Sequence, residues 1–396
     1  MHPADHLRGS KSDKLRGRKI VLGLTGSIAA VECVKLCREL VRHGAEVHVV
    51  MSKDAQMIIH PWAMEFASGT PVTTEIDGRV QHVSLCGDVP DRADLLLIAP
   101  ATANTISKIA TGVDDTPVTT FATTALGGGM PVIVVPAMHG TMIGHKAVTE
   151  NIARLKKLGV TVLMPRMEEH KAKMPEMEHI VAAVMAHVGR ADLKKRKVLV
   201  IAGATEEPID DIRVITNRSS GETGVELARV AYERGAEVDL WMGRCDVEIP
   251  SYVNTKRFST FEQLARLTKG VKHDIVFFPA AVSDYSPEKV GGKIPSDKQR
   301  LTITLKRNPK LIDRIKAKVV VGFKAQAKLD DAKLVEEARA LLKRSKCDFV
   351  VANKVEEVVP GQTRVIIVTQ DGATDEVHGR KSQVAEKILD VAVGMI

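Results

Sequence analysis

The feature that most constrains this chain is a pattern that occurs twice. Lys19-Ile-Val-Leu-Gly-Leu and Lys197-Val-Leu-Val-Ile-Ala each open with a cation and continue as an apolar strand. Downstream, Gly44-Ala-Glu-Val and Gly235-Ala-Glu-Val each lead into a second apolar run. A strand, a helix and a second strand form the repeating unit of open α/β sheets. The sequence therefore predicts an α/β protein with two Rossmann-like domains.

Length and charge suggest where these domains begin and end. A chain of 396 residues is too long for one hydrophobic core. Residues 1–18 carry more basic than acidic side chains and no apolar stretch, so we expect a mobile leader. We place the first domain at 19–188 and the second at 189–396, and we expect the charged join at 190–197 to be a solvated linker. An Asp371-Gly372 turn between two strand-like runs predicts a terminal hairpin.

The composition argues against nucleic-acid and membrane partners. The net charge of +8 is spread along the chain, and the aromatic residues, 3% of the total, are not interleaved with basic clusters as a stacking platform requires. A mild basic excess suits anionic small molecules. The longest apolar runs have the length of strands, and the five cysteines match no disulfide framework or zinc site. We expect a cytoplasmic protein without a secretory signal.

The turns after the first two strands carry small polar residues. Gly26, Ser27 and Ile28 follow the first strand, and Ser52 follows the second. The pattern is not GxGxxG, and no acidic residue stands where a dinucleotide ribose would be bound, which disfavours an NAD(P)-dependent dehydrogenase. Two readings of the serines stay open, because a serine at a helix start can hold a phosphate or simply cap the helix.

A longer run in the first half resembles a known family. Residues 93–116 contain a buried strand that ends at Pro100, followed by Ala-Thr-Ala-Asn-Thr. This run closely resembles the flavin-binding segment of the flavin-containing cysteine decarboxylases. The resemblance implies a flavodoxin-like domain that binds FMN through Thr102, Ala103, Asn104 and Thr105, together with the small residues of the earlier turns.

Two further segments carry the same resemblance. Gln81-His-Val-Ser-Leu looks like the family's His-Ile-x-Leu segment, which implies that His82 orients the substrate carboxylate and takes the thiol proton while the flavin removes hydride. Residues 136–142 are similar to Pro-x-Met-Asn-x-x-Met, with His139 in place of the asparagine. The family's flap cysteine is also missing, and the corresponding stretch, 165–175, offers His170, Lys171 and Lys173 as proton donors instead.

The second half resembles the phosphopantothenate–cysteine ligases. Residues 202–210 and 217–221 match that family's Ala-Gly-x-Thr-x-Glu-Pro-[Ile/Leu]-Asp and Asn-x-Ser-Ser-Gly patterns. The resemblance assigns Asn217 to an acyl nucleotide intermediate, Lys293 to the triphosphate, and Asp284 to the nucleotide and Mg²⁺. It places the rest of the nucleotide site at Pro279, Ala280, Pro309, Lys310 and Phe323.

Together these segments resemble one bifunctional family of coenzyme A biosynthesis, in its archaeal-like form. The resemblance implies CTP-dependent ligation of 4′-phosphopantothenate with cysteine, then FMN-dependent decarboxylation to 4′-phosphopantetheine. It also implies a homo-oligomer with decarboxylase trimers and ligase dimers, up to a dodecamer. The alternatives are an active ligase with an impaired or regulatory decarboxylase-like domain, and a flavin prenyltransferase, which has no use for the second half.

Overall fold

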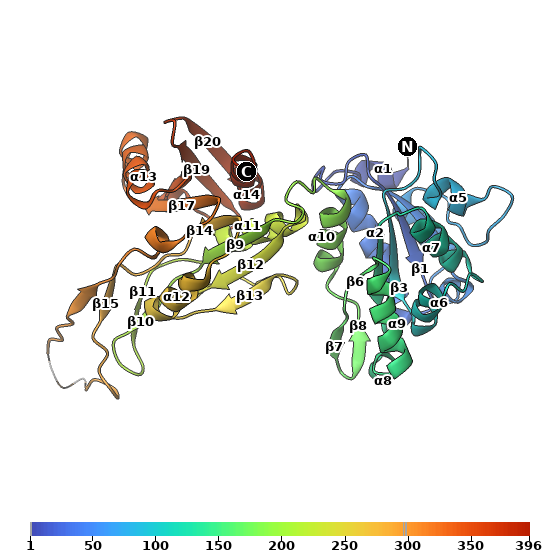
Figure 1. Cartoon of the computed structure of the whole chain (residues 1–396), viewed down its shortest axis with the longest axis horizontal. Helices are drawn as coiled ribbons and strands as arrows, with labels where there is room; N and C mark the ends of the chain where they lie inside the picture. The colour runs from blue at the N-terminus through green and yellow to red at the C-terminus, as the bar shows by residue number, and fades with distance from the viewer. Residues whose placement is uncertain (1, 296, 298) are drawn as a thin grey trace. The chain divides into compact units, whose positions relative to one another are not determined.

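Each half of the chain folds around its own sheet. The computed structural model describes residues 2–295, 297 and 299–396, and these form two units that divide between Ala191 and Asp192 (Figure 1). The first unit has a five-stranded parallel sheet in the order β2-β1-β3-β4-β6. Its strands are β1 (Lys19–Leu24), β2 (Glu46–Met51), β3 (Leu95–Ala101), β4 (Val132–Pro136) and β6 (Thr161–Val162).

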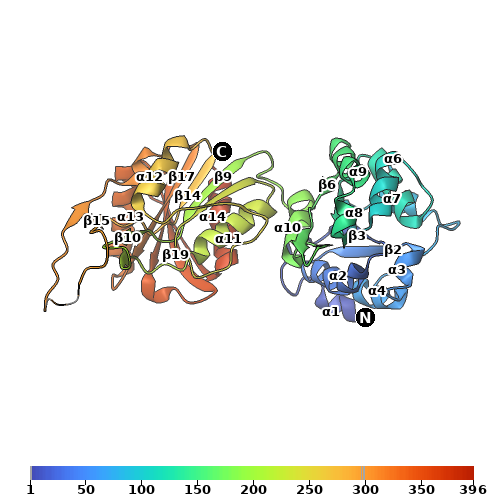
Figure 2. The ribbon, with the colours of Figure 1, turned by 90° about the horizontal axis from the view of Figure 1, so that it is seen from below.

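Helices cover both faces of the first sheet (Figure 2). One face packs against α2 (Cys33–Arg42), α4 (Pro61–Ser68) and α10 (Met177–Val188). The other packs against α5 (Gln81–Cys86), α6 (Ala103–Thr111), α7 (Pro117–Gly127) and α9 (Lys146–Lys157). Short elements complete the unit: α1 (Pro3–Leu7), η1 (Ile28–Glu32), α3 (Lys53–Gln56), α8 (Gly140–Ile143), β5 (Met138–His139), β7 (Arg166–Glu168) and β8 (Lys171–Lys173).

The second unit has an eight-stranded sheet in the order β13-β12-β9-β14-β17-β18-β19-β20. The first six strands are parallel, and the last two are antiparallel. They are β9 (Lys197–Ala202), β12 (Glu237–Met242), β13 (Asn254–Arg257), β14 (Ile275–Phe278), β17 (Val319–Gln326), β18 (Phe349–Lys354), β19 (Gln362–Thr369) and β20 (Thr374–Arg380).

One face of the second sheet packs against α11 (Glu222–Glu233) and α14 (Lys381–Val393), and the other against α12 (Phe261–Leu267) and α13 (Asp331–Ser345). Two ribbons add to the unit: β10 (Glu206–Pro208) with β11 (Val214–Thr216), and β15 (Tyr285–Pro287) with β16 (Leu305–Arg307). The 3₁₀ turns are η2 (Thr268–Gly270), η3 (Leu311–Arg314) and η4 (Val355–Glu357).

The predicted α/β fold with two Rossmann-like sheets is confirmed. The order β2-β1-β3-β4 in the first unit has its counterpart in β12-β9-β14-β17 of the second. The register is also the same, because Lys19 stands opposite Glu46 in one sheet and Lys197 opposite Glu237 in the other. Within the described residues, no helix has the length and apolar character needed to cross a membrane.

The expectation of a mobile leader at 1–18 is wrong. Residues 3–7 form a helix whose Ala4 is fully buried, and Leu15 is fully buried in the core of the first unit. The backbone N–H of Leu15 donates to the carbonyl of His43 at 2.8 Å. The leader is therefore an ordered part of the first unit.

The join at 190–197 differs from the expected solvated linker in the same way. Leu193 is fully buried in the core of the second unit, and its N–H donates to the carbonyl of Arg234 at 3.1 Å. The predicted hairpin around Gly372 is present as β19 and β20, but it is not terminal, because the chain continues into α14.

Candidate functional site

The carboxyl edge of the first sheet gathers the predicted flavin-binding residues. The segments after β1, β2 and β3 are neighbours there, as the strand order requires. The Ser52 N–H donates to the Leu24 carbonyl at 3.0 Å, and the Thr102 N–H donates to Thr25 Oγ1 at 3.0 Å. Open α/β sheets bind ligands at this edge. The predicted residues therefore share one edge of the sheet, although they are far apart in the sequence.

The hydroxyl groups at this edge act mainly as helix caps. Ser52 Oγ accepts the Ala55 N–H at 3.2 Å at the start of α3, and Thr102 Oγ1 accepts the Thr105 N–H at 3.2 Å at the start of α6. Ser52 caps α3 as one of the two readings for the serines predicts, and its own O–H can still be donated to a phosphate. Ser27 precedes η1 and makes no side-chain capping bond. Its hydroxyl is therefore available to a ligand as both donor and acceptor.

Glycine is required at Gly26. A Cβ atom at this position would lie 2.4 Å from Cβ of Asp54, which is closer than two carbon atoms can approach. The absence of a side chain thus lets the turn after β1 approach the start of α3. Backbone N–H groups at closely approaching helix starts suit the phosphate of a flavin nucleotide.

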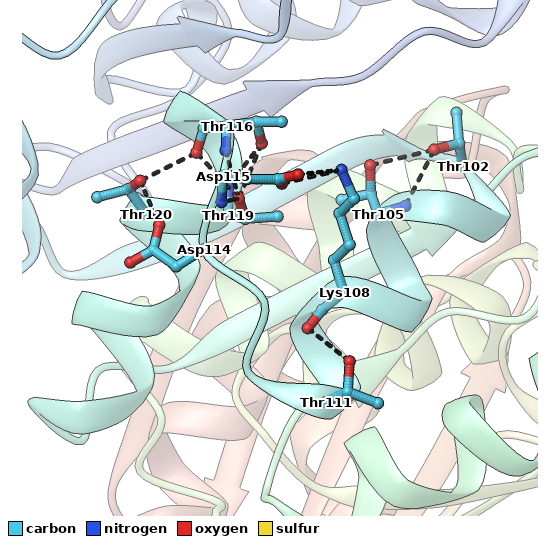
Figure 3. Close-up of polar contacts among 9 residues, drawn as sticks. All are labelled: Thr102, Thr105, Lys108, Thr111, Asp114, Asp115, Thr116, Thr119 and Thr120. Carbon is cyan, nitrogen blue, oxygen red and sulfur yellow. Dashed lines mark hydrogen bonds and ion pairs between the residues drawn. The ribbon is translucent and has the colours of Figure 1, made fainter.

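The segment after the predicted flavin-binding run is fixed by its own polar contacts (Figure 3). Lys108 Nζ lies 2.8 Å from both carboxylate oxygens of Asp115, which ties α6 to the loop before α7. Thr116 caps α7 by accepting the Thr119 N–H at 3.2 Å. Asp114 is hydrogen-bonded to Thr120 one turn further along the helix. These contacts hold α6, and with it Thr102 to Thr105, in one position.

A cavity of about 730 Å³ lies beside this edge. Its lining includes Ser27, Ile28 and His139, together with Lys171 and Lys173 from the β7–β8 hairpin. His139 stands opposite Lys171 in the pairing of β5 with β8, and the Gly140 N–H donates to the His170 carbonyl at 2.8 Å. The β7–β8 hairpin, within the stretch 165–175 that was expected to supply a proton donor, therefore forms part of the cavity wall.

The candidate proton donors on this hairpin differ in their surroundings. Lys173 Nζ lies 3.1 Å from Glu168 and 3.3 Å from Glu169, and hydrogen bonds to these carboxylates raise its pKa. Lys171 lines the same cavity and has no recorded ion pair among the described residues. His170 contributes its carbonyl to the hairpin and is not among the described lining residues. Lys171 is thus the donor least restrained by neighbours.

His82 does not lie with His139. It belongs to α5 and packs near Phe121 of α7, with ring centroids 6.5 Å apart, on the sheet face opposite α10. Its Nδ1 is buried and has no hydrogen-bond partner within the described part of the chain. His139 is exposed, and its Nδ1 lies 3.0 Å from Thr141 Oγ1. One copy of the chain therefore does not bring the two predicted catalytic histidines together.

The second unit has a smaller cavity, of about 110 Å³, at the carboxyl edge of its own sheet. Its lining includes most of the predicted nucleotide-binding residues, namely Ala280, Asp284, Pro309, Lys310 and Phe323. Lys310 forms an ion pair with Asp284 across the cavity. Arg344 of α13 also lines it, and the sequence reasoning did not single out this residue. A basic residue in the last turn of a helix that packs beside β17 was the available signal.

Asn217 lies close to this cavity, whereas Lys293 does not. Asn217 Nδ2 donates to the Ala281 carbonyl at 3.0 Å, next to the lining residue Ala280. Lys293 is exposed and follows β15, whose ribbon extends away from the sheet in Figure 1. Neither Lys293 nor Pro279 is among the described lining residues.

A magnesium ion would find one carboxylate in this cavity. Among the described residues, no three His, Cys, Asp or Glu side chains are grouped as a metal site. Mg²⁺ that is bound with a nucleotide commonly takes one or two carboxylates, with substrate phosphates and water as its other ligands. Asp284 alone is compatible with that mode of binding.

Comparison with known proteins covers almost the whole chain. Residues 8–189 match the Flavoprotein family, and residues 193–395 match the DNA/pantothenate metabolism flavoprotein C-terminal domain. The chain is 48% identical to the coenzyme A biosynthesis bifunctional protein CoaBC of Thermococcus kodakarensis over 98% of both chains. It is 37% identical to that of Methanocaldococcus jannaschii, over 98% of this chain and 97% of the relative. The Vibrio vulnificus protein is 35% identical over 86% and 88%, respectively.

Proposed function

The chain belongs to the CoaBC family and is a phosphopantothenoylcysteine synthetase and decarboxylase of coenzyme A biosynthesis, and from this premise we propose how its two units divide the work. The first unit decarboxylates, and the second ligates. The observation that supports this division is that each unit has its own cavity at the carboxyl edge of its own sheet. We also keep the cytoplasm as the proposed compartment.

In the first unit the cavity beside Ser27 and His139 receives the substrate. The starts of η1, α3 and α6 would hold FMN through Gly26, Ser27, Ile28, Ser52 and Thr102 to Thr105. Bound FMN would supply the hydride acceptor and donor. His139 orients the substrate carboxylate, because its imidazole lines the cavity and can donate a hydrogen bond.

Lys171 is the proposed proton donor. Decarboxylation breaks the bond between carbon and carboxylate, and the carbon that loses carbon dioxide must gain a proton. Lys171 reaches the cavity without a competing carboxylate partner among the described residues, whereas Lys173 is engaged by Glu168 and Glu169. Replacement of Lys171 by Ala should therefore slow phosphopantetheine formation more than replacement of Lys173 or His170. Full activity after all three replacements would exclude this hairpin as the source of the proton.

His82 acts in a site that a second copy completes. Its Nδ1 is buried and has no hydrogen-bond partner among the described residues, and it lies on the face of the sheet opposite the cavity. His82 therefore cannot reach a substrate bound in the cavity of its own chain. Exposed apolar side chains such as Met57 and Trp62, 83% and 77% exposed, suit contact with another subunit. We propose the homo-oligomer that the family resemblance implies, with trimers of the first unit and dimers of the second.

In the second unit, the carboxylate of 4′-phosphopantothenate attacks the α-phosphate of the nucleoside triphosphate and displaces pyrophosphate. The amine of cysteine then displaces the nucleoside monophosphate. Lys310, and Asp284 through Mg²⁺, neutralise the phosphates in the cavity, and Asn217 holds the acyl nucleotide beside Ala281. Lys293 lies outside this cavity and is assigned to the triphosphate on the family resemblance. We propose CTP as the nucleotide, on the resemblance to ligases of prokaryotic type.

A product assay tests both activities at once. The full chain is mixed with 4′-phosphopantothenate, cysteine, Mg²⁺ and CTP, and the products are identified by mass spectrometry. We expect 4′-phosphopantetheine. Accumulation of phosphopantothenoylcysteine would instead favour the second candidate, an active ligase with an impaired decarboxylase. Two features support that candidate: His139 stands in place of the family's asparagine, and the 165–175 stretch has no cysteine.

A further inference from the structure

Lys293 has a fixed backbone and an exposed side chain. The N–H of Gly292, just before it, donates to Asp211 Oδ2 at 2.8 Å, and the N–H of Ile294, just after it, donates to Asp210 Oδ2 at 3.1 Å. The Lys293 side chain makes no hydrogen bond or ion pair with the described residues. A lysine whose two flanking peptide groups are held while its ammonium is exposed is suited to meeting a ligand.

Residues 211 and 213 also donate hydrogen bonds to the backbone carbonyls on either side of Lys293. The Asp211 N–H donates to the Gly292 carbonyl at 3.1 Å, and Arg213 Nη1 donates to the Ile294 carbonyl at 3.3 Å. Lys289 Nζ lies 2.7 Å from Asp211 Oδ1. Residues 210–213 therefore hold the segment 289–294 through backbone groups on both sides of Lys293. We call residues 210–213 the aspartate loop.

Asp210 is the buried centre of the aspartate loop. Its side chain is fully buried and accepts hydrogen bonds from the N–H groups of Ile212 at 2.8 Å and Arg213 at 2.6 Å, and from Arg213 Nη1 at 3.1 Å, besides that of Ile294. Burial raises the pKa of Asp210, but backbone hydrogen bonds from Ile212, Arg213 and Ile294 outweigh it and keep the pKa below its usual value. Hydrogen bonds to a charged acceptor are stronger than neutral ones, so this arrangement is rigid.

We propose that Asp210 and Asp211 are positioning residues for Lys293, which they hold so that its ammonium meets the polyphosphate of the nucleoside triphosphate. The inference rests on the proposed ligase function of Lys293 and goes beyond it, because neither aspartate is among the described residues that line the nucleotide cavity. The two carboxylates do not repel the polyphosphate, because Arg213 and Lys289 pair with them. Ordering the backbone in advance reduces the entropy lost when the flexible lysine binds.

The test uses the full chain with Asp211→Asn, Asp210→Asn and Lys293→Ala, and Glu288→Gln as a matched control. Glu288 is an exposed carboxylate of the same segment that pairs with Lys306, and it has no recorded bond to residues 292–294. Loss of positioning without loss of the cation should lower ligase kcat/KM for CTP by roughly tenfold or more in Asp211→Asn. The Glu288→Gln control should stay near the wild-type value.

A double mutant separates positioning from general support of the fold. If Asp211 acts through Lys293, then Asp211→Asn should cause no further loss in the Lys293→Ala background. Hydrogen exchange should show faster exchange of the 290–295 amides in Asp211→Asn and little change elsewhere. Decarboxylation of supplied phosphopantothenoylcysteine by the first unit should be unaffected, and unchanged exchange in the core strands of the second unit would show that the variant ligase unit is folded. Asp211 is exposed, so this variant remains informative even if Asp210→Asn, which alters a buried group, does not fold.

The outcomes are distinguishable. If Lys293→Ala keeps full ligase activity, then the assigned role of Lys293 fails, and the inference fails with it. If Lys293→Ala loses activity but Asp211→Asn does not, then only the positioning role is overturned. Multiplicative losses in the double mutant also overturn it, because they would mean that Asp211 acts independently of Lys293.

Discussion

The two units share a four-stranded frame, β2-β1-β3-β4 in the first and β12-β9-β14-β17 in the second, and they differ at its carboxyl edge, where the predicted sites lie. Four strands have the same order in both, and a buried leucine, Leu15 or Leu193, closes each frame ahead of the first strand. The chain passes from β1 almost directly into η1, whereas residues 203–221 between β9 and α11 contain the β10–β11 ribbon and the aspartate loop. The difference teaches that the frame is independent of the chemistry, which depends on what is inserted after each strand.

A second difference concerns one equivalent position at the end of the helix. His43 and Arg234 both precede Gly-Ala-Glu-Val and accept a leucine N–H at their carbonyl. The Arg234 side chain is 3% exposed and pairs with Asp192 at 2.6 Å and Asp390 at 2.9 Å. His43 faces Lys11, Lys14 and Glu39. Burial, reinforced by Lys11, lowers its pKa to about 4. The second unit thus buries a cation, Arg234, that is paired with carboxylates, whereas the first unit has a neutral imidazole, His43, at the equivalent position.

Truncating the two leucines should have the largest effect. Leu15→Ala and Leu193→Ala each remove a fully buried side chain, which should lower the free energy of unfolding of its own unit by about 2–5 kcal/mol. Hydrogen-exchange mass spectrometry in urea on the full chain can follow each unit separately. Leu158→Ala, at a leucine that is 53% exposed, serves as the control and should change stability little. An unchanged unfolding midpoint in either leucine variant would mean that its segment does not contribute to the stability of that unit.

The second prediction concerns the stability of the first unit, which should depend on pH through His43, whereas the second unit, with Arg234 at the equivalent position, should show no such dependence. The unfolded imidazole has a pKa near 6.5 and the folded one about 4, so between these values the unfolded state holds more protons and stability rises with pH. Acidification from about pH 6.5 to 4 should therefore cost the first unit roughly 1–3 kcal/mol through His43. Arg234 keeps its charge over this range.

His43→Gln isolates this contribution, because glutamine does not titrate. We expect the variant to lose less stability than the wild type as the pH falls through this window, measured by urea unfolding at several pH values. Arg234→Gln is not a suitable control, because it would leave Asp192 and Asp390 without their partner. Equal pH slopes for the wild type and His43→Gln would show that His43 has the same pKa in the folded and unfolded states.

The four-stranded frame was predictable because the two repeated segments that begin at Lys19 and Lys197 consist of strand-forming residues. The leader and the join were missed because their buried apolar side chains, Ala4 and Leu15 in one and Leu193 in the other, are too few among charged residues to give a hydrophobic periodicity. The shared spacing Leu15-x-x-Arg18 and Leu193-x-x-Arg196 was the available signal. Helix α14 was missed although its buried positions follow a helical period, because the hairpin before it was taken to end the chain.

The sites were predictable to the extent that they follow the strands. Segments after adjacent parallel strands meet at one edge, so Ser27 and Thr102 could be placed together, as could Ala280 and Asp284. The separation of His82 from the cavity could not be predicted, because it depends on which face of the sheet its short helix covers. Likewise, the bonds around Lys293 join segments about eighty residues apart, and only the folded chain reveals them.

The smallest expected effect compares a glycine with a lysine at the same position of the two frames. Gly17 has φ +74° and Lys195 has φ +67°, two residues after their respective leucines. A Cβ atom at Gly17 would meet no heavy atom within 4 Å, so a side chain there is opposed by backbone strain alone. A left-handed residue with a side chain costs about 1–2 kcal/mol, and the greater freedom of glycine in the unfolded chain offsets about 0.5–1 kcal/mol of this.

The two exchanges should therefore have opposite signs and similar size. Gly17→Lys should destabilise the first unit by about 1 kcal/mol or less, and Lys195→Gly should stabilise the second by a similar amount. Urea unfolding of each variant, followed by hydrogen exchange in the affected unit, measures both. Because charge changes with each exchange, Gly17→Gln and Lys195→Gln provide controls that separate charge from backbone strain. If both exchanges destabilise, then the Lys195 side chain makes a favourable contact that outweighs its strain, and the two frames differ at this turn as well as at their carboxyl edge.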